Sequence, residues 1–261
     1  MSTAGPLQGA AAIWPAKTIC QEVLPFLPCF TVEVLPTIDS TNSELMRRAR
    51  AGQHCPVLLV AEQQTAGRGR LGRNWQSSGG GSLTFSLALP LAPENWFGLS
   101  LAVGVSVAQS LHPALQLKWP NDIWLEDRKL AGILIETARF GEKRFAVIGV
   151  GINIHSRADD GLSTAPACLQ ELLPELGPPA ALLRIVPALV QALVLFEAQG
   201  FGPFQAAFQA RDRLRGRAVV LSDGTSGEAA GVDATGALLV HTSAGMKAIT
   251  SAEVSVRPVG A

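Results

Sequence analysis

The chain has 261 residues, of which 48% are hydrophobic and 16% charged, so it can form a full-sized domain plus a small one and is not intrinsically disordered. Its 21 basic and 21 acidic residues give a formal net charge of zero, which argues against a protein that coats nucleic acid. The four cysteines, Cys20, Cys29, Cys55 and Cys168, include no CxxC-type pair, which argues against a zinc site or a redox motif and fits a reducing compartment.

No segment is typical of a signal peptide or of a membrane span. Residues 1–12 lack the basic start of a signal peptide. The most apolar run, residues 180–196, is interpreted as too short for a bilayer and is interrupted by Arg184, Pro187 and Gln191. We therefore expect a cytoplasmic protein with no membrane partner.

The beginning of the chain is expected to be a lead-in. Residues 1–30 are rich in Ala, Pro and Gly, which predicts loose order with a short helix near residues 18–24. The β-branched alternation that follows predicts a strand over residues 31–35.

A helix is then predicted to start with Thr41 as its N-cap residue. Thr41 and Glu44 have the spacing of a capping box, and Gly52 follows the last turn. Two interpretations of Ser40 and Thr41 remain: they only cap the helix, or their hydroxyls also hold a polar ligand.

The middle of the chain predicts a mixed helical and sheet-rich domain. Strands are predicted over residues 56–62, 82–88, 115–119, 123–125, 130–137 and 144–149. Helices are predicted over residues 93–111, 168–173, 180–199 and 203–213. The last four strands are short and separated by turn residues, so sequential antiparallel pairing is expected.

The sequence changes character after about residue 215. Residues 218–256 predict five short strands separated by glycine-containing turns, which is typical of a small barrel. We therefore predict a lead-in (1–30), a catalytic domain (31–214) and a C-terminal domain (215–261). The alternating arginines just before this segment are either a nucleic-acid patch or, as we favour, a solvated or phosphate-facing surface; they are Arg211, Arg213, Arg215 and Arg217.

A glycine- and arginine-rich run follows the strand at 56–62. It reads Gly67-Arg68-Gly69-Arg70-Leu71-Gly72-Arg73. Glycine allows close backbone approach, and arginine supplies a planar set of donors for phosphate or carboxylate. By itself the run could be a solvated surface loop, but two later lysine motifs indicate that it closes over an anion.

The lysine motifs lie on the predicted antiparallel strands. The first is Lys118-Trp119-Pro120-Asn121-Asp122, and the second begins with Lys129 and contains Gly132, where a ligand can lie against the backbone. A further run, Gly149-Val150-Gly151-Ile152-Asn153, follows. Four cations with one acidic partner suit chemistry at phosphate; they are Arg68, Arg70, Lys118 and Lys129, with Asp122. The sequence contains neither a P-loop nor a Gly-x-Ser-x-Gly nucleophile motif.

Together these motifs resemble the biotin protein ligases, also called biotin–[acetyl-CoA-carboxylase] ligases or holocarboxylase synthetases. The resemblance includes Asp39-Ser40-Thr41-Asn42 and Gln64 and covers about residues 31–257. It implies an α+β fold: a core like that of class II aminoacyl-tRNA synthetases, with a mixed sheet flanked by helices, and a small C-terminal SH3-like β-barrel. It also implies an enzyme that uses biotin, ATP and Mg²⁺ to form biotinyl-5′-adenylate. The acyl group then passes to a lysine of the biotin carboxyl carrier domain of acetyl-CoA carboxylase or a related carboxylase.

The resemblance also assigns residues. Those implied for biotin are Ser40, Thr41, Asn42, Gln64, Arg68, Gly69, Arg70, Lys129 and Gly132. Those implied for ATP or the adenylate are Arg68, Arg70, Lys118, Asn121, Lys129 and Asn153, with Asp122 near Mg²⁺. Catalysis is assigned to Lys129, Arg68, Arg70, Lys118 and Asp122, whereas Arg73 has no assigned role.

Several alternatives stay open. Trp75 and Trp119 either line the biotin pocket or are ordinary core aromatics. A lipoate-type ligase would share the fold, and a non-catalytic biotin-binding regulator would share the pocket. Only about 30 residues precede the first matched strand, so no DNA-binding module is expected. Both a monomer and a homodimer are compatible with the sequence.

Overall fold

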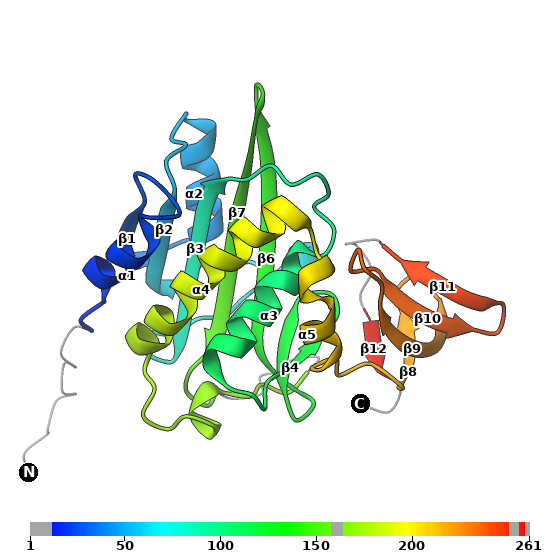
Figure 1. Ribbon diagram of the computed structural model, residues 1–261. Helices are drawn as coiled ribbons and strands as arrows, with labels where there is room; N and C mark the ends of the chain where they lie inside the picture. The colour runs from blue at the N-terminus through cyan, green and yellow to red at the C-terminus, as the bar shows by residue number, and fades with distance from the viewer. Residues whose placement is uncertain (1–11, 158–163, 251–255, 259–261) are drawn as a thin grey trace, which may run out of the picture.

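The computed structural model describes residues 12–157, 164–250 and 256–258. Its first part is a seven-stranded mixed sheet in the order β1-β2-β3-β7-β6-β5-β4 (Figure 1). The strands are β1 (Thr31–Ile38), β2 (Val57–Gln64), β3 (Ser82–Pro90), β4 (Gln116–Lys118), β5 (Asp122–Leu125), β6 (Arg128–Phe140) and β7 (Lys143–Asn153). Only β1 and β2 are parallel, so the predicted antiparallel pairing of the last four strands is confirmed.

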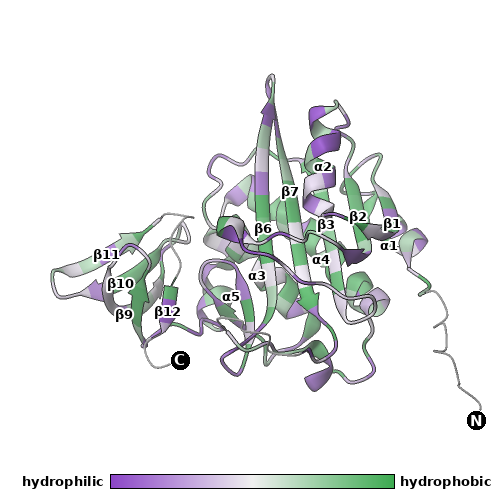
Figure 2. Cartoon of the chain, turned by 180° about the vertical axis from the view of Figure 1, so that it is seen from behind, coloured by the Kyte–Doolittle hydropathy of each residue, from purple (hydrophilic) through white to green (hydrophobic). Residues whose placement is uncertain are grey.

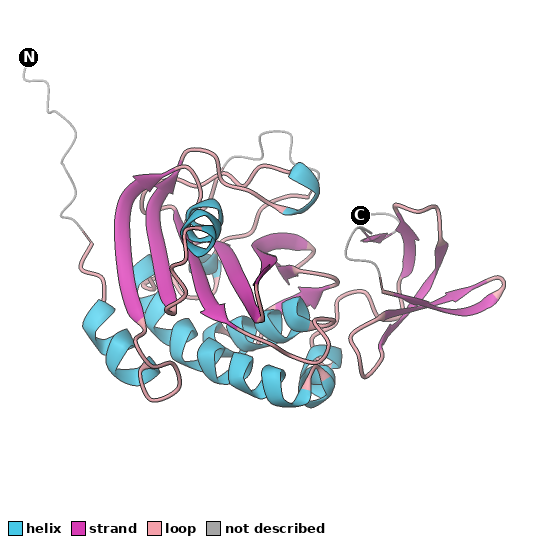
Figure 3. Ribbon diagram, turned by 90° about the horizontal axis from the view of Figure 1, so that it is seen from above, coloured by secondary structure: helices cyan, strands magenta, loops and turns pink. Residues whose placement is uncertain are grey.

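The helices lie in two layers of unequal size. They are α1 (Ala16–Val23), α2 (Thr41–Arg50), α3 (Leu99–Leu111), α4 (Pro178–Gln199) and α5 (Gln205–Gln209). Three of them, α1, α3 and α4, pack on one face of the sheet (Figure 3). Of the described helices, α2 alone lies on the other face, with its hydrophilic side turned outward (Figure 2).

The residues of β7 explain why one small helix is enough on that face. Ile148, Val150 and Ile152 point into the main core below α3 and α4. On the opposite face, Phe145 and Val147 form a second apolar cluster with α2. The next residues on that face are Gly149, Gly151 and Asn153, because side chains alternate along a strand. The apolar surface therefore ends where α2 begins, and the rest of this face is left uncovered.

Helix α2 differs in detail from its prediction. Its N-cap is Ser40, whose Oγ accepts a hydrogen bond from the Ser43 amide at 3.3 Å. Thr41 is therefore the first helical residue and not the cap, and Glu44 pairs with Arg47 and Arg48 instead of completing a capping box. The predicted end is confirmed, since Gly52 has a φ of 87° just beyond the helix.

Other predicted helices are too long. The helix predicted from residue 93 begins at Leu99, because Gly98 before it has a φ of 78° that no helix allows. After α5, the chain pairs with Leu117 of β4 through Arg211 and Arg213, which ends the helix. The segment at 168–173 contains only a 3₁₀ turn, η2 (Leu169–Glu171).

Helix α4 is longer than predicted. It has 22 residues, and among the described residues it is the one helix whose length and composition would allow it to cross a membrane. The expectation that this run is too short is therefore wrong. A core helix of a soluble protein passes the same test, and Ile185, Leu189 and Phe196 of α4 are fully buried in the main core.

The C-terminal segment forms a second, five-stranded antiparallel sheet. Its strands are β8 (Ala218–Leu221), β9 (Ser226–Val232), β10 (Leu238–Thr242), β11 (Gly245–Ile249) and β12 (Val256–Pro258), in the order β11-β10-β9-β8-β12. The prediction of five short strands is confirmed. This sheet stands beside the first one, at the β4 end (Figure 1).

Side-chain contacts help to join the C-terminal segment to the first part of the chain, and arginines of the cluster take part in them. Trp119 is 3% exposed, and its Nε1 donates a 3.1 Å hydrogen bond to the carbonyl of Gly236. Asp127, in the turn between β5 and β6, pairs with Arg213 and Arg217, and Arg213 is the largest cause of the lowered pKa of this carboxyl. Arg211 Nη1 donates to backbone carbonyls of residues 112, 113 and 115. These three arginines are partly exposed and bind the protein itself.

Candidate functional site

A pocket of about 680 Å³ occupies the part of the sheet that α2 leaves uncovered. Its lining combines the start of α2, the end of β2, the glycine- and arginine-rich run and facing positions of β5, β6 and β7. All thirteen residues to which the sequence assigned a role in binding or catalysis lie in this lining, so the structure brings the separate motifs together. The lining includes these assigned residues: Ser40, Thr41, Asn42, Gln64, Arg68, Gly69, Arg70, Lys118, Asn121, Asp122, Lys129, Gly132 and Asn153.

Glycines form the floor because side chains from above occupy the space of a Cβ. A Cβ on Gly149 would lie 2.1 Å from Asn42 Oδ1, and one on Gly151 would lie 2.4 Å from the Trp75 ring. Gly132 is paired with Gly151 in the next strand, and its Cβ would lie 3.3 Å from Lys129 Nζ. The register therefore orders the pocket along β6 and β7: Asn42 at one end, Trp75 in the middle and Lys129 at the other end.

The neutral end is a buried hydrogen-bond network at the start of α2. Gln64 Oε1 accepts from the Thr41 amide at 2.7 Å and from its hydroxyl at 3.0 Å. Ser86 Oγ lies 2.7 Å from Thr41 Oγ1 and 2.6 Å from Asn42 Oδ1. Ser40, Thr41 and Asn42 are each at most 3% exposed. These groups are thus fixed in place before any ligand arrives.

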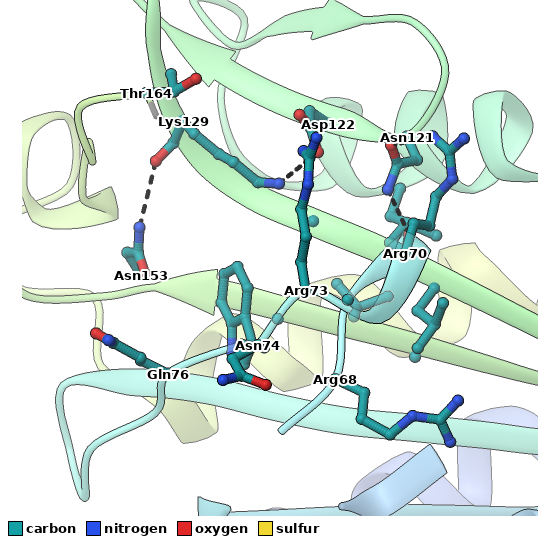
Figure 4. Close-up of a pocket in the computed structure, with 18 of the residues that line it drawn as sticks. Arg68, Arg70, Arg73, Asn74, Gln76, Asn121, Asp122, Lys129, Asn153 and Thr164 are labelled. Atoms are coloured by element: carbon teal, nitrogen blue, oxygen red, sulfur yellow. Dashed lines mark hydrogen bonds and ion pairs between the residues drawn. The ribbon is translucent and has the colours of Figure 1, made fainter. Parts of the chain in front are cut away.

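The other end of the pocket is cationic. Lys129 Nζ lies 2.6 Å from Asp122 Oδ1, and Lys118 Nζ lies 4.0 Å from Asp122 Oδ2 (Figure 4). Lys118 also lies over the Trp124 ring, 5.1 Å from its centroid. The pKa of Lys118 is lowered to about 8, chiefly because the amine is buried. Asp122 opposes this shift, and the positive charges of Lys129, Arg73 and Arg70 add to it. This end concentrates positive charge that a polyanion would relieve.

The backbone of Lys129 is held by its neighbours. Its amide donates to Ala165 at 2.8 Å, and its carbonyl accepts from Asn153 Nδ2 at 3.2 Å. Asn153 Nδ2 also donates to the carbonyl of Ala167, whereas Asn153 Oδ1 is buried without a protein partner. Asn153 therefore positions Lys129 and presents one unsatisfied acceptor at the pocket.

The glycine- and arginine-rich run lies across the opening, and we call residues 67–75 the lid. Within it, the Gly69 amide donates to Arg73 at 2.7 Å and the Trp75 amide to Gly67 at 2.8 Å. Trp75 carries the lid down onto the floor glycines, with its ring at Gly151. The lid is thus folded on the pocket and is not a free surface loop.

Two arginines attach the lid to the sheet. Arg68 Nη2 donates to Glu136 Oε1 at 3.0 Å, and Arg70 Nη1 donates to Asn121 Oδ1 at 2.8 Å. Burial lowers the pKa of Arg70. Arg73, which had no predicted role, extends toward Asp122 at the cationic end (Figure 4). All three arginines therefore add positive charge to the pocket or fix the lid above it.

The sequence reasoning missed some residues at the pocket, and one of the two tryptophans considered for its lining lies elsewhere. Glu136 of β6 lies beside the lining, where it contacts Asn42 and Arg68, and its place in the same strand as Lys129 and Gly132 was the signal that could have found it. Trp124 and Arg257 line the pocket; Arg257 comes from β12, and no sequence spacing connects it to the site. Trp119 lies in the main core, so its interpretation as a core aromatic is confirmed, whereas Trp75 lines the pocket.

A resident magnesium ion does not fit these residues. Among the described residues, no group of three or more His, Cys, Asp or Glu side chains could hold a metal ion. Asp122, the predicted ligand, already has Lys129 Nζ 2.6 Å away. Mg²⁺ usually keeps several waters and binds through substrate phosphates, so it would arrive as part of the nucleotide complex. We assign no step to a metal held by Asp122.

Two family models match this chain. Residues 34–153 match the Biotin/lipoate A/B protein ligase family, and residues 216–257 match the Biotin protein ligase C terminal domain.

Known proteins are similar over most of the chain. The bifunctional ligase/repressor BirA of Salmonella typhimurium is 38% identical, over 87% of this chain and 74% of that protein. The biotin–[acetyl-CoA-carboxylase] ligase of Paracoccus denitrificans is 32% identical, over 85% of this chain and 98% of its own length. Among solved structures, the biotin protein ligase from Aquifex aeolicus in complex with biotin and ATP superposes with a TM-score of 0.74 at 30% identity, over 87% of this chain and 98% of that one.

We predict that Gly151→Ala displaces Trp75 from the floor. The added Cβ would lie 2.4 Å from the indole ring, so the ring must move, while a strand backbone accepts alanine. Tryptophan emission should shift to longer wavelength, and the shift should be absent in a Trp75→Phe background. Gly79→Ala is the control, because its Cβ would have no atom within 4 Å. An unchanged spectrum for Gly151→Ala would contradict the packing described.

Proposed function

The chain belongs to the biotin protein ligase family, and we propose that it carries out the family reaction in this pocket, with biotin at the neutral end and the phosphates of ATP at the cationic end. It is an ATP-dependent enzyme that activates biotin and transfers it to a carrier protein. The observation that supports this placement is the strand register, in which the neutral, prearranged network and the cations around Lys129 lie at opposite ends of one pocket.

The neutral end suits the polar ring of biotin. Ser40, Thr41 and Gln64 present hydroxyl and amide groups that their own network holds in fixed orientations. Prearranged donors and acceptors lose little entropy when a ligand binds. The side-chain amide of Asn42 is hydrogen-bonded to Leu134, Glu136 and Ser86. We therefore propose that Asn42 shapes this end of the pocket and contacts the edge of biotin.

The first step joins two anions. A biotin carboxylate oxygen attacks the α-phosphorus of ATP, and the bond to the bridging oxygen breaks to release pyrophosphate. Lys129 lies where the carboxylate and the α-phosphate would meet, so its charge relieves their repulsion and positions both. Lys118, Arg70 and Arg73 face the remaining phosphate oxygens, and Asn121 holds Arg70 in place.

The second step transfers the acyl group. The amine of a carrier lysine attacks the acyl carbon, loses a proton, and AMP leaves. The mixed anhydride is prone to hydrolysis until then, so a lid that excludes water preserves it. Arg68, Gly69 and Arg70 are placed in that lid, which explains why arginines and glycines alternate there.

The finer architecture is also a proposal. The parallel pair β1 and β2 within an otherwise antiparallel sheet supports a core like that of class II aminoacyl-tRNA synthetases. The five short strands β8 to β12 support an SH3-like barrel, with domains at 31–214 and 215–261. The carrier is proposed to be the biotin carboxyl carrier domain of acetyl-CoA carboxylase or a related carboxylase. A cytoplasmic location, a monomer or homodimer and the absence of a DNA partner stay predictions.

The direct test of the function is incubation with biotin, MgATP and a carrier domain, followed by mass measurement of the carrier. The carrier should gain one biotinyl group. A parallel reaction with lipoate in place of biotin tests whether the chain is a lipoate-type ligase, since the family model covers both ligase types. Modification with lipoate alone would contradict the proposal, and binding of biotin without pyrophosphate release would indicate a non-catalytic regulator.

We predict that Lys129→Ala lowers the rate of adenylation by about 100-fold or more, because one prearranged charge at the reacting atoms is lost. The rate is measured as biotin-dependent pyrophosphate release, with circular dichroism as the check of folding. Lys143→Ala is the matched control, since Lys143 is exposed at the far turn between β6 and β7. Pyrophosphate release at the wild-type rate would contradict the role of Lys129.

The lowered pKa of Lys118 predicts an alkaline loss of activity. Below about pH 8 this lysine is protonated and attracts phosphate, and above that pH the charge is lost. The value of kcat/KM for MgATP should therefore fall as the pH rises through about 8, since this ratio reports ionisation of the free enzyme. Lys118→Arg should remove this fall, and Lys118→Gln should be low at every pH. An identical alkaline fall in Lys118→Arg would show that another group is responsible.

A further inference from the structure

Each carboxylate oxygen of Glu136 accepts a hydrogen bond from a different part of the chain. Oε1 accepts the 3.0 Å hydrogen bond from Arg68 of the lid, and Oε2 accepts a 3.0 Å hydrogen bond from Asn42 of α2. The side chain is 24% exposed, so it is partly shielded from water. No other described carboxylate bridges the lid and the neutral end of the pocket.

The two partners of Glu136 differ in how firmly they are held. Asn42 is 3% exposed and has further hydrogen bonds to Leu134 and Ser86. The Arg68 side chain is 49% exposed, and its other partner is the hydroxyl of Ser43. Glu136 therefore connects a buried, multiply bonded group at the neutral end to a half-exposed group of the lid.

We propose that Glu136 is a positioning residue that couples the arrangement of the biotin end to closure of the lid. This proposal rests on the proposed function, because the coupling matters only if the lid protects an adenylate. With Asn42 in place, Oε2 is held and Oε1 is turned toward Arg68. When Asn42 is displaced, the carboxylate loses its fixed orientation and the lid loses its charged partner on the sheet.

Glu136→Gln tests the coupling because glutamine has one acceptor oxygen and no charge. It can satisfy Asn42 or Arg68 but not both. We expect biotinyl-adenylate to leave the enzyme about tenfold faster, because a hydrogen bond to a charged group is lost. Pyrophosphate formation at saturating biotin and ATP should stay within about threefold of wild type, since Glu136 does not touch the reacting atoms.

A second measurement needs no substrate. Amide hydrogen exchange over residues 67–75 of the ligand-free protein should be faster in Glu136→Gln than in wild type. Glu142→Gln is the matched control, because Glu142 pairs only with Arg139 among described residues, at 3.6 Å, and is almost fully exposed. This readout keeps the proposal testable even if no adenylate forms, which would overturn the proposed function alone.

The double variant Arg68→Gln with Glu136→Gln decides between coupling and independent effects. Release of adenylate should be no faster than in either single variant, because both remove the same bond. Additive effects, or unchanged release and exchange in Glu136→Gln, would overturn the proposal. Reduced stability with normal release and exchange would leave Glu136 a purely structural residue, which also overturns it.

A separate observation concerns two cysteines that lie 26 positions apart in the sequence. Cys29 Sγ lies 3.0 Å from Cys55 Sγ, and both residues are exposed. Each comes two residues before a register pair, since Thr31 of β1 is opposite Val57 of β2. The two thiols thus face each other just before the first residues of the adjacent parallel strands β1 and β2, where an oxidant can reach them.

We infer that Cys29 and Cys55 form a disulfide by exchange with a low-molecular-weight disulfide. The thiolate of one cysteine attacks the reagent and releases one thiol. The second cysteine loses its proton and attacks the resulting mixed disulfide, releasing the other thiol. Two protein thiols are oxidised and one reagent disulfide is reduced, so the electrons balance. The bond would close a loop that contains α2 and the Ser40–Asn42 segment, which should stabilise the folded state.

The test compares protein treated with oxidised glutathione or with dithiothreitol. A peptide linking Cys29 to Cys55 should appear only after oxidation, together with a higher Tm. Cys29→Ser should abolish both, whereas Cys20→Ser is the control that should change neither. Separate glutathione adducts on the two cysteines, or a cross-link without any change in Tm, would overturn the inference.

Discussion

The site depends on one packing constraint: α2 covers only part of one face of the central sheet. Large side chains on β7, Phe145 and Val147, bury themselves under α2, and the same face then continues with Gly149 and Gly151. Because a glycine offers no side chain to bury, the sheet needs no further helix there. The opposite face carries apolar residues packed under α3 and α4, so the sheet is anchored from that side.

The charged side chains at this open face lie close together at one end of the pocket. Lys118, Lys129 and Asp122 are partly buried together, so the two lysine charges stand close, and Asp122 is the carboxylate that opposes them among the described residues. Such a cluster is costly in the empty protein and is relieved when a polyanion binds. In the proposed function, this repulsion favours the phosphate end of the substrate at Lys129, and the uncharged network at α2 favours its neutral end. The proposed orientation of the substrate thus follows from the sheet register.

Much of this could be predicted from the sequence, but only where signals are local. Strand pairing after Gln116 followed from short strands with tight turns, and the motifs identified the pocket residues. The cap was misassigned by one residue because Ser40 and Thr41 both carry a hydroxyl. Contacts across long separations were not visible: Trp75 on Gly151, Glu136 on Arg68, and Cys29 beside Cys55 depend on tertiary packing that no spacing encodes.

The most direct test of the account is a crystal structure with a stable analogue of biotinyl-5′-adenylate. The account predicts the biotin ring at Thr41 and Gln64, the acyl-phosphate linkage within hydrogen-bond distance of Lys129 Nζ, and the lid closed with Arg68 on Glu136. An adenylate in the reverse orientation along β6 and β7, or one bound outside the face beside α2, would contradict it.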